Sequence, residues 1–340
     1  MSAPASPELI MQVGTGFWGS KTLLSAVELE LFTVLGDERL TAAEIGDRLA
    51  LHPRSLADFL DALVSLGLLA RDADGVTARY ANTVDTALFL DKGQPTYIGG
   101  ILEMANERLY PFWGNLTRAL RTGEPQNEAA AGEDFFATLY SDEDRLELFL
   151  RAMQGVQLGP FMALVDCIDL SSANVLCDVG GANGTLSAIA VQRYPNLRAI
   201  SFDLAPVVPV AQRHLKAMGV DDRVTAVAGD FFADDLPSAD VITMGNILHD
   251  WNEDEKCTLI GKAHAALPEG GRFIAIENLI DDDRRANTFG LLMSLNMLIE
   301  TPGGFDYTPT QFDDWCRAAG FTHTEVVSLA GPTSAAVAYK

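Results

Sequence analysis

The sequence has little positive charge. Its 340 residues carry 24 Lys and Arg against 47 Asp and Glu, which gives a formal net charge of −23. This net negative charge repels phosphate backbones and anionic lipid surfaces. Tight binding to nucleic acid also usually needs a basic patch that releases counterions. The charge balance therefore disfavours nucleic acids and membrane surfaces as partners.

Cysteines and long apolar runs are also scarce. The four cysteines are too widely spaced to indicate a disulfide framework or a zinc site. No run approaches the roughly 20 apolar residues that span a bilayer. The first residues, MSAPASPELIMQ, lack the basic start and continuous apolar segment of a signal peptide. We therefore expect a soluble cytoplasmic protein.

A hydrophobic share of 48% is typical of a globular protein, and at roughly 150 residues per domain the length suggests two domains. Residues 17–91 have a helical pattern with two recognisable helix starts. Thr41 to Glu44 form a capping box, and a second helix is expected over residues 53–66. Residues 68–77 predict two short strands around an Asp-Gly turn. This arrangement resembles a winged helix.

A winged helix often binds DNA through its second helix. Here that helix carries a single cation, Arg54, and it also holds Asp58 and Asp61. A helix that faces phosphates should be more basic.

The winged-helix-like region is followed by a mostly helical connector, predicted at residues 97–169. We expect helices at 112–121, 135–139 and 143–167.

The second half alternates short apolar runs with helical patterns. Strands are predicted at residues 173–179, 197–202, 224–227, 241–244, 272–277, 322–329 and 335–339. This alternation predicts an α/β fold with a doubly wound, mostly parallel sheet and a terminal antiparallel pair. In such sheets ligands bind beyond the carboxyl ends of the strands.

The first of these strands ends in DVGGANG, residues 178–184. Its glycines allow a sharp turn and a close approach to a ligand at a helix N-terminus. The segment is not the dinucleotide fingerprint G-x-G-x-x-G, because Ala182 and Thr185 replace two of the glycines. Asp178 would repel a pyrophosphate but suits a cationic ligand.

The next two strands also end in acidic residues. Asp203 could accept hydrogen bonds from ribose hydroxyls. Asp230 could accept one from an exocyclic amine, beside the aromatic face of Phe231. Three acids and an aromatic ring at successive strand ends indicate a nucleoside without phosphates, which fits S-adenosylmethionine better than NAD. Each carboxylate taken singly could instead cap the following helix.

The fourth strand leads to His249, whose side-chain type accepts a proton near neutral pH. A lone histidine is more often a helix cap or a surface group. Glu277, however, ends the neighbouring strand and could orient the imidazole through its second nitrogen. The pair favours a general base.

The segments DVGGANG, FDL, GDFF, ILHDWNEDE and PGGFDYTPTQF resemble the small-molecule O-methyltransferase family. That family includes plant caffeate and isoflavone methyltransferases and bacterial enzymes that modify polyketide antibiotics. The resemblance covers nearly the whole chain and implies a seven-stranded Rossmann-like methyltransferase sheet. It also implies a homodimer with a dimerisation domain at 1–96, a connector lining the substrate pocket at 97–170, and a catalytic domain at 171–340.

The resemblance also implies roles for single residues. His249 would be the general base, flanked by Glu277 and Asp306. The cofactor S-adenosylmethionine, which leaves as S-adenosylhomocysteine, would contact Asp178, Gly180, Gly181, Gly184, Asp203, Leu204, Asp230, Phe231 and Asn246. Asp306 stands where the family has glutamate, so whether it reaches His249 is open. Ala182 replaces a family glycine, and we expect negative φ there.

A phenol, with a pKa near 10, is within reach of a histidine base, so we expect an aromatic hydroxyl as the acceptor. Methionines pack adaptably against aromatic rings. Candidate acceptor-pocket residues, which could equally be core, are Met153, Phe161, Met162, Met293, Asn296 and Met297.

No metal is expected, because Asp281 to Asp283 are followed at once by Arg284 and Arg285, as in a solvated loop. Two other functions are open. A C- or N-methyltransferase could use the same scaffold, since the cofactor site does not define the acceptor. A ligand-sensing winged-helix regulator is a third possibility, against which the net charge and the His249 and Glu277 pair count.

Overall fold

The computed structural model describes residues 5–75, 77–128 and 143–340. The helix predicted at 135–139 lies outside these residues. The chain divides into two compact units. One comprises Met1–Pro111 with Arg151–Gly155, and the other Phe112–Leu150 with Val156–Lys340.

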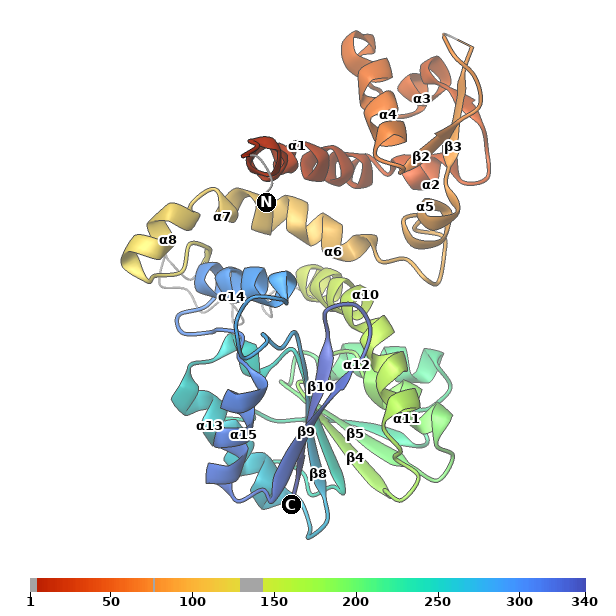
Figure 1. The fold of residues 1–340 in the computed structure, drawn as a ribbon. Helices are drawn as coiled ribbons and strands as arrows, with labels where there is room; N and C mark the ends of the chain where they lie inside the picture. The colour runs from red at the N-terminus through yellow and green to blue at the C-terminus, as the bar shows by residue number, and fades with distance from the viewer. Residues whose placement is uncertain (1–4, 76, 129–142) are drawn as a thin grey trace. The chain divides into compact units, whose positions relative to one another are not determined.

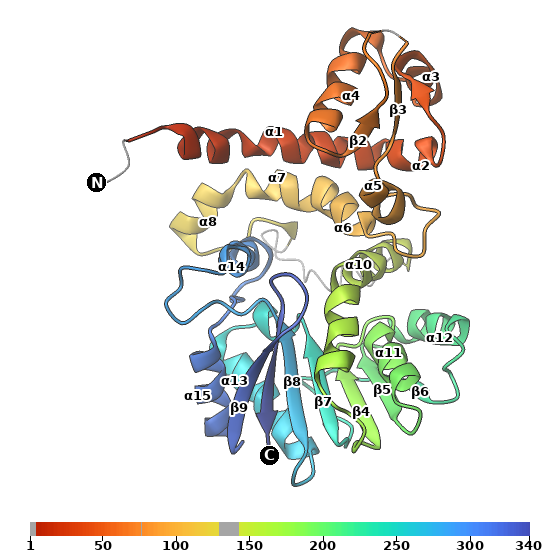
Figure 2. The ribbon, with the colours of Figure 1, turned by 45° about the vertical axis from the view of Figure 1, so that its right-hand side comes forward.

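The second unit is built on a seven-stranded sheet of order β6-β5-β4-β7-β8-β10-β9 (Figures 1 and 2). The pairs among β4 to β8 are parallel, and β10 is antiparallel to both β8 and β9. The strands are β4 (Val175–Val179), β5 (Arg198–Asp203), β6 (Val224–Ala228), β7 (Val241–Gly245), β8 (Arg272–Glu277), β9 (His323–Ser328) and β10 (Ser334–Tyr339). The predicted doubly wound sheet with a terminal antiparallel pair is confirmed.

Helices cover both faces of this sheet (Figures 1 and 2). Side chains alternate between the faces along each strand. In β8, Phe273 packs with the core under α13 (Glu253–Ala266) and α15 (Pro309–Ala319), whereas Ile274 packs with α11 (Thr185–Arg193). The second face is completed by α12 (Val208–Ala217) and the end of α10 (Glu143–Cys167). Two apolar cores therefore hold the strand ends in place.

The remaining helices of this unit precede the sheet or connect its later strands. The sequence predicted a single helix at 112–121, and this is wrong. The chain forms two helices here, α7 (Tyr110–Trp113) and α8 (Leu116–Thr122). Gly114 lies at the break, and glycine is a poor helix former. The helix α14 (Thr288–Glu300) is capped by the Asn287 side chain, which accepts a hydrogen bond from the Gly290 amide.

The first unit is mainly helical with a small antiparallel sheet of order β1-β3-β2. Thr41 and Glu44 form the expected capping box at the start of α3. The elements are α1 (Glu8–Glu28), α2 (Leu31–Leu35), β1 (Leu40–Thr41), α3 (Ala42–Arg48), η1 (Pro53–Ser55), α4 (Leu56–Ser65), β2 (Leu69–Arg71), β3 (Arg79–Asn82), α5 (Val84–Phe89), α6 (Gly99–Met104) and η2 (Ala105–Leu109). This is the predicted winged-helix-like arrangement.

The predicted hairpin is misplaced at its second strand, which begins at Arg79 and not within residues 68–77. Asp72 explains the longer connection. Its amide donates to the Arg79 carbonyl and its carboxylate accepts from the Arg79 amide, so the two strands close across a wider loop.

Among the described residues no helix is both long and apolar enough to cross a membrane.

Candidate active site

Asp178 is buried near the carboxyl end of β4. Thr243, its register partner on the neighbouring strand β7, donates a hydrogen bond of 2.7 Å to the Asp178 carboxylate. Burial raises the pKa of Asp178 to about 7. The sequence alone does not indicate this role of Thr243, because it depends on β4 and β7 being neighbours.

The loop after β4 needs its glycines for space and for backbone conformation. Gly180 has φ +67°, and a Cβ there would lie 2.3 Å from the Ile247 side chain. A Cβ on Gly181 would lie 2.4 Å from the Ser201 hydroxyl. Gly184, at the start of α11, has φ +81°. The loop therefore presents backbone at a point where side chains do not fit.

Ala182 contradicts the expectation of negative φ, since its φ is +50°. A non-glycine residue in this region costs on the order of 1 kcal/mol. The Ala182 amide donates a hydrogen bond of 2.8 Å to Asp203, and its side chain packs with Leu146 and Leu150. These contacts offset the backbone cost and tie the glycine loop to the end of β5.

Asp203 therefore joins two strand ends. Besides Ala182, its carboxylate accepts a hydrogen bond of 2.7 Å from the amide of Leu204. Burial raises the pKa of Asp203 to about 6, and the two backbone hydrogen bonds act in the opposite direction. Each carboxylate oxygen has a second lone pair that a ligand hydroxyl could use.

The segment after β6 closes on itself. Asp230 accepts hydrogen bonds from the amides of Phe232 and Ala233 in a turn; no helix begins here, so it does not cap one. Phe231 packs edge-on against Trp251, with ring centroids 5.8 Å apart. Lys262 of α13, which no motif in the sequence indicates, donates a hydrogen bond of 2.8 Å to the Phe232 carbonyl.

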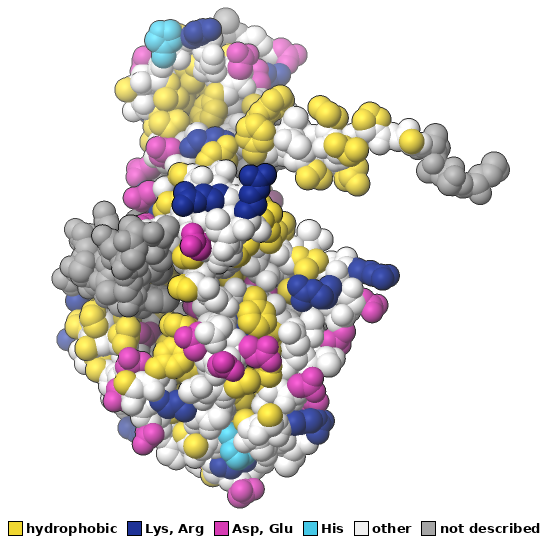
Figure 3. Space-filling model, turned by 90° about the vertical axis from the view of Figure 1, so that its left-hand side faces the viewer, with side chains coloured by type: hydrophobic (Ala, Val, Ile, Leu, Met, Phe, Trp, Pro, Cys, Tyr) yellow, Lys and Arg dark blue, Asp and Glu magenta, His cyan; other side chains and the backbone are white. Residues whose placement is uncertain are grey.

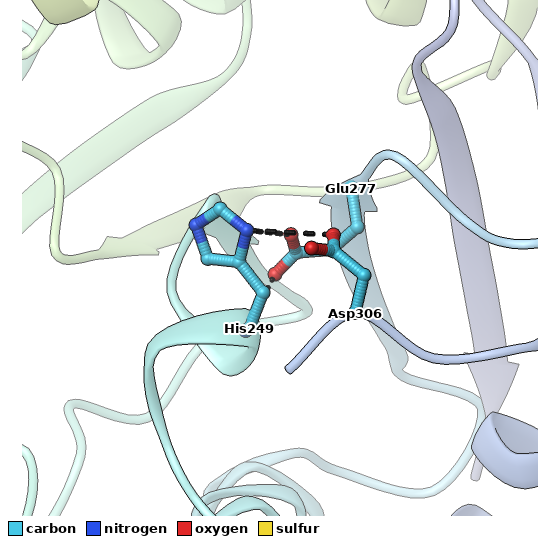
Figure 4. A group of neighbouring side chains, drawn as sticks. All are labelled: His249, Glu277 and Asp306. Carbon is cyan, nitrogen blue, oxygen red and sulfur yellow. Dashed lines mark hydrogen bonds and ion pairs between the residues drawn. The ribbon is translucent and has the colours of Figure 1, made fainter. Parts of the chain in front are cut away.

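His249 lies in the short helix η4 (Leu248–Asp250) and is 6% exposed. Its Nδ1 is 3.6 Å from Glu277 Oε2 and 3.5 Å from Asp306 Oδ1. Figure 4 shows both carboxylates pointing at this ring nitrogen. Asp306 therefore reaches His249 despite its shorter side chain. On the opposite side of the ring, Nε2 lies 3.5 Å from Asp250 Oδ1.

The backbone around Gly304 explains how Asp306 comes so close. A Cβ on Gly304 would lie 2.6 Å from the His249 carbonyl oxygen and 2.7 Å from that of Asp250. The Gly304 amide donates to the Thr301 hydroxyl at 2.7 Å, and the Asp306 amide donates to the Ser294 hydroxyl at 3.2 Å. The glycine pair in the PGGFDY segment was the available signal, but its purpose is visible only in the folded chain.

The electrostatics of the cluster favour a strong base. Burial lowers the pKa of the His249 imidazole, but the charges of Glu277 and Asp250 and the contact with Asp306 outweigh it, and the net direction is upward. Burial raises the pKa of Glu277 to about 7 and that of Asp250 to about 6.

One atom from each of His249, Glu277 and Asp306 lies within 4.8 Å of the others, so by residue type this group could hold a cation. Lys256, however, is fully buried nearby, and the charges of these carboxylates raise the pKa of its ammonium group. We therefore assign no metal ligand. The carboxylate of Asp281 accepts hydrogen bonds from the backbone amides of Arg285, Ala286 and Asn287, so it stabilises its own loop.

The candidate acceptor-pocket residues have different surroundings. Phe161 is buried and comes within 3.4 Å of the position that a Cβ on Gly245 would occupy. Asn296 accepts a hydrogen bond of 2.8 Å from the Trp113 indole. Met297 is buried, Met293 half-buried and Met162 exposed. Met153 belongs to the first compact unit.

Comparison with known proteins identifies the family. The O-methyltransferase domain matches residues 113–322, and the O-methyltransferase dimerisation domain matches residues 11–92. The chain belongs to the O-methyltransferase family. It is an enzyme that uses S-adenosylmethionine as its methyl donor.

Individual relatives cover nearly the whole chain. A tetracenomycin polyketide synthesis 8-O-methyl transferase of Streptomyces glaucescens is 40% identical over 98% of this chain and 97% of its own. An N,N-dimethyltransferase of Streptomyces rimosus is 34% identical, over 86% of this chain and 84% of its own. The crystal structure of human N-acetylserotonin methyltransferase in complex with S-adenosylmethionine covers 100% of this chain and 99% of that one, with a TM-score of 0.91 and 30% identity.

Proposed function

We propose that the enzyme methylates a phenolic hydroxyl of an aromatic small molecule, a secondary metabolite such as a polyketide or an aromatic acid, with His249 as general base. The observation that carries this proposal is the buried imidazole with two carboxylates at Nδ1. The polyketide acceptor is supported by the 40% identical relative, whose name gives it an 8-O-methyl transfer in polyketide synthesis.

The carboxyl ends of the parallel strands have features that S-adenosylmethionine requires. We propose that the cofactor contacts predicted from the sequence are made there. The enclosed carboxylates of Asp178 and Asp203 have raised pKa values, so a nearby cation would favour their ionised forms. The glycine loop allows the protein backbone itself to approach the cofactor closely, and Phe231 offers an aromatic surface. Bound S-adenosylmethionine supplies an electrophilic methyl group.

His249 then has one task, which is to take the acceptor proton. Because Nδ1 faces Glu277 and Asp306, we place the proton of the neutral imidazole there, and Nε2 receives the hydroxyl proton. The imidazolium that forms is stabilised by these carboxylates and by Asp250. The same carboxylates raise the pKa of His249 toward that of a phenol, which favours a phenol over an aliphatic alcohol.

A labelled methyl donor with a panel of hydroxylated aromatic compounds tests the reaction. We expect methyl ethers, identified by mass spectrometry and NMR. His249→Ala should lower kcat by roughly 10² to 10⁴, while cofactor affinity, measured by calorimetry, stays unchanged. The matched control is His323→Ala, the same substitution at an exposed histidine of β9, which should keep the wild-type kcat. A rate undiminished in His249→Ala would show that positioning alone suffices.

N- or C-methylation is the second candidate function. The 34% identical relative is named an N,N-dimethyltransferase, and the cofactor residues do not select the acceptor atom. Nitrogen- or carbon-linked methyl products from the same panel would favour this function over phenol methylation.

We also propose that the chain acts as a homodimer through residues 1–96, with 97–170 as a helical connector that contributes to the substrate pocket and 171–340 as the catalytic domain that binds S-adenosylmethionine. The dimerisation-domain match covers residues 11–92. The helix α1 exposes hydrophobic side chains (Figure 3), namely Leu9, Ile10, Met11, Val13, Phe17 and Trp18. A monomeric protein rarely leaves such a contiguous apolar surface in water.

A further inference from the structure

Lys256 is a lysine with no exposed surface. It lies on α13 and is 0% exposed, whereas lysines are almost never fully buried unless they are paired. Its Nζ donates a hydrogen bond to the Trp251 carbonyl and lies 3.5 Å from the centroid of the Phe305 ring. These two contacts hold the ammonium group at one place beside the active site.

Acidic groups on several elements act on this ammonium through their charges, namely Asp250 of η4, Glu253 of α13, Glu277 of β8 and Asp306 in the segment before α15. Asp250 and Asp306 adjoin Trp251 and Phe305, the two residues that Nζ contacts. The other titratable groups of this cluster are His249 and Tyr307, whose ring centroid is 5.9 Å from Nζ. Burial lowers the pKa of Lys256 and the carboxylates raise it, and the result of about 8 leaves the group charged at neutral pH.

The charge balance shows why a cation is needed. When His249 is neutral, Lys256 is the positive charge that acts on ionised Asp250, Glu277 and Asp306 among the residues that the structure describes. Buried carboxylates in such a group repel one another, so some of them would take up protons. A protonated Glu277 or Asp306 would stabilise the imidazolium of His249 far less.

We propose that Lys256 is a positioning residue for methyl transfer, whose ammonium group keeps the carboxylates around His249 ionised while the imidazole is neutral. The inference rests on the proposed role of His249 as base. Before transfer Lys256 is the positive charge of the cluster. After transfer His249 carries the acceptor proton as a second positive charge, and Lys256 neither gains nor loses a proton.

The pH dependence of the rate tests this role. Removing a cation makes proton binding by the whole cluster more favourable, so the acidic limb of the kcat/KM profile should move to higher pH in Lys256→Met. We expect a shift of about one to two pH units, the effect of a unit charge several ångströms away at an effective dielectric constant near 20. Cofactor affinity should be retained. An acidic limb at the wild-type position would overturn the proposal.

The control is Lys262→Met, which removes a lysine from the same helix. Its ammonium group donates to the Phe232 carbonyl and is absent from the interactions of the His249 cluster. Its acidic limb should stay at the wild-type position, whatever happens to cofactor affinity.

A second variant covers the case in which Lys256→Met folds poorly. Lys256→Met combined with Asp250→Asn removes one charge of each sign, so the pair should unfold at a higher temperature than Lys256→Met alone. If the double variant is no more stable than the single one, or also fails to fold, Lys256 serves packing and the proposal is wrong. This readout needs no activity. If the double variant is more stable and His249→Ala is nevertheless fully active, His249 is not the general base. Lys256 would still be the positive charge that balances the carboxylates.

Discussion

The carboxyl group of Asp178 titrates in an unusual range because it is enclosed at the end of β4. Its pKa is about 7 in the folded protein and about 4 in an unfolded chain. Between these values the folded protein holds a proton that the unfolded chain has released. The free energy of unfolding should therefore fall as pH rises from about 4 to 7.

We predict that Asp178→Asn flattens this dependence by up to about 1.4 kcal/mol per pH unit in that window, because asparagine does not titrate. Urea unfolding of variant and wild type at several pH values between 4.5 and 7.5 measures it. Asp281→Asn is the control. Backbone hydrogen bonds lower the pKa of Asp281 to about 2, so its curve should run parallel to wild type above pH 4.5. Equal slopes for Asp178→Asn and wild type would mean that Asp178 is ionised throughout.

Residue identities at the strand ends were readable from the sequence, but their partners were not. The positions of Asp178, Asp203 and Asp230 at or just beyond the carboxyl ends of β4, β5 and β6 follow from the strand pattern. The bond from Thr243 to Asp178 requires β4 and β7 to be neighbours although they are far apart in the chain. The positive φ of Ala182 is also a tertiary effect, since Asp203 and a packing contact compensate for it.

At the scale of elements, the segment before α15 delivers Asp306 to the active site. It can do so because Gly304 passes close to the carbonyl oxygens of His249 and Asp250. These are backbone atoms of η4, so they cannot rotate away as the end of a flexible side chain could. The position of the Asp306 carboxylate thus depends on a glycine two residues away.

Gly304→Ala should displace this segment and lower kcat by about ten- to hundredfold, since misplacing a catalytic group by about 1 Å can cost this much. Cofactor affinity should change little. Gly261→Ala, in α13, is the control, because a Cβ at that glycine meets nothing within 4 Å. Steady-state kinetics with calorimetry of cofactor binding separates the two effects. A wild-type kcat in Gly304→Ala would show that the segment tolerates the shift.

For the whole molecule, the exposed apolar face of α1 makes assembly testable. Phe17 is 53% and Trp18 64% exposed in the single chain. We predict that replacing both by serine weakens the dimer, because burying apolar surface contributes roughly 25 cal/mol per Å². Light scattering after size exclusion should show a monomer at concentrations where wild type is dimeric. Met218→Ser, another exposed hydrophobic residue, should stay dimeric, and a dimer that persists in the double variant would place the interface elsewhere.

Local patterns in the sequence determined the order of strands and helices along the chain, because the periodicity of apolar side chains and the helix caps act over a few residues. They also determined which acids and which histidine stand at strand ends. Only the tertiary structure decided that Lys256 is buried where the charges of Asp250, Glu277 and other acidic groups act on it, that Asp306 reaches His249, and that Thr243 bonds to Asp178. Each of these contacts joins elements distant in sequence, and burial is what gives their charges and hydrogen bonds their effect.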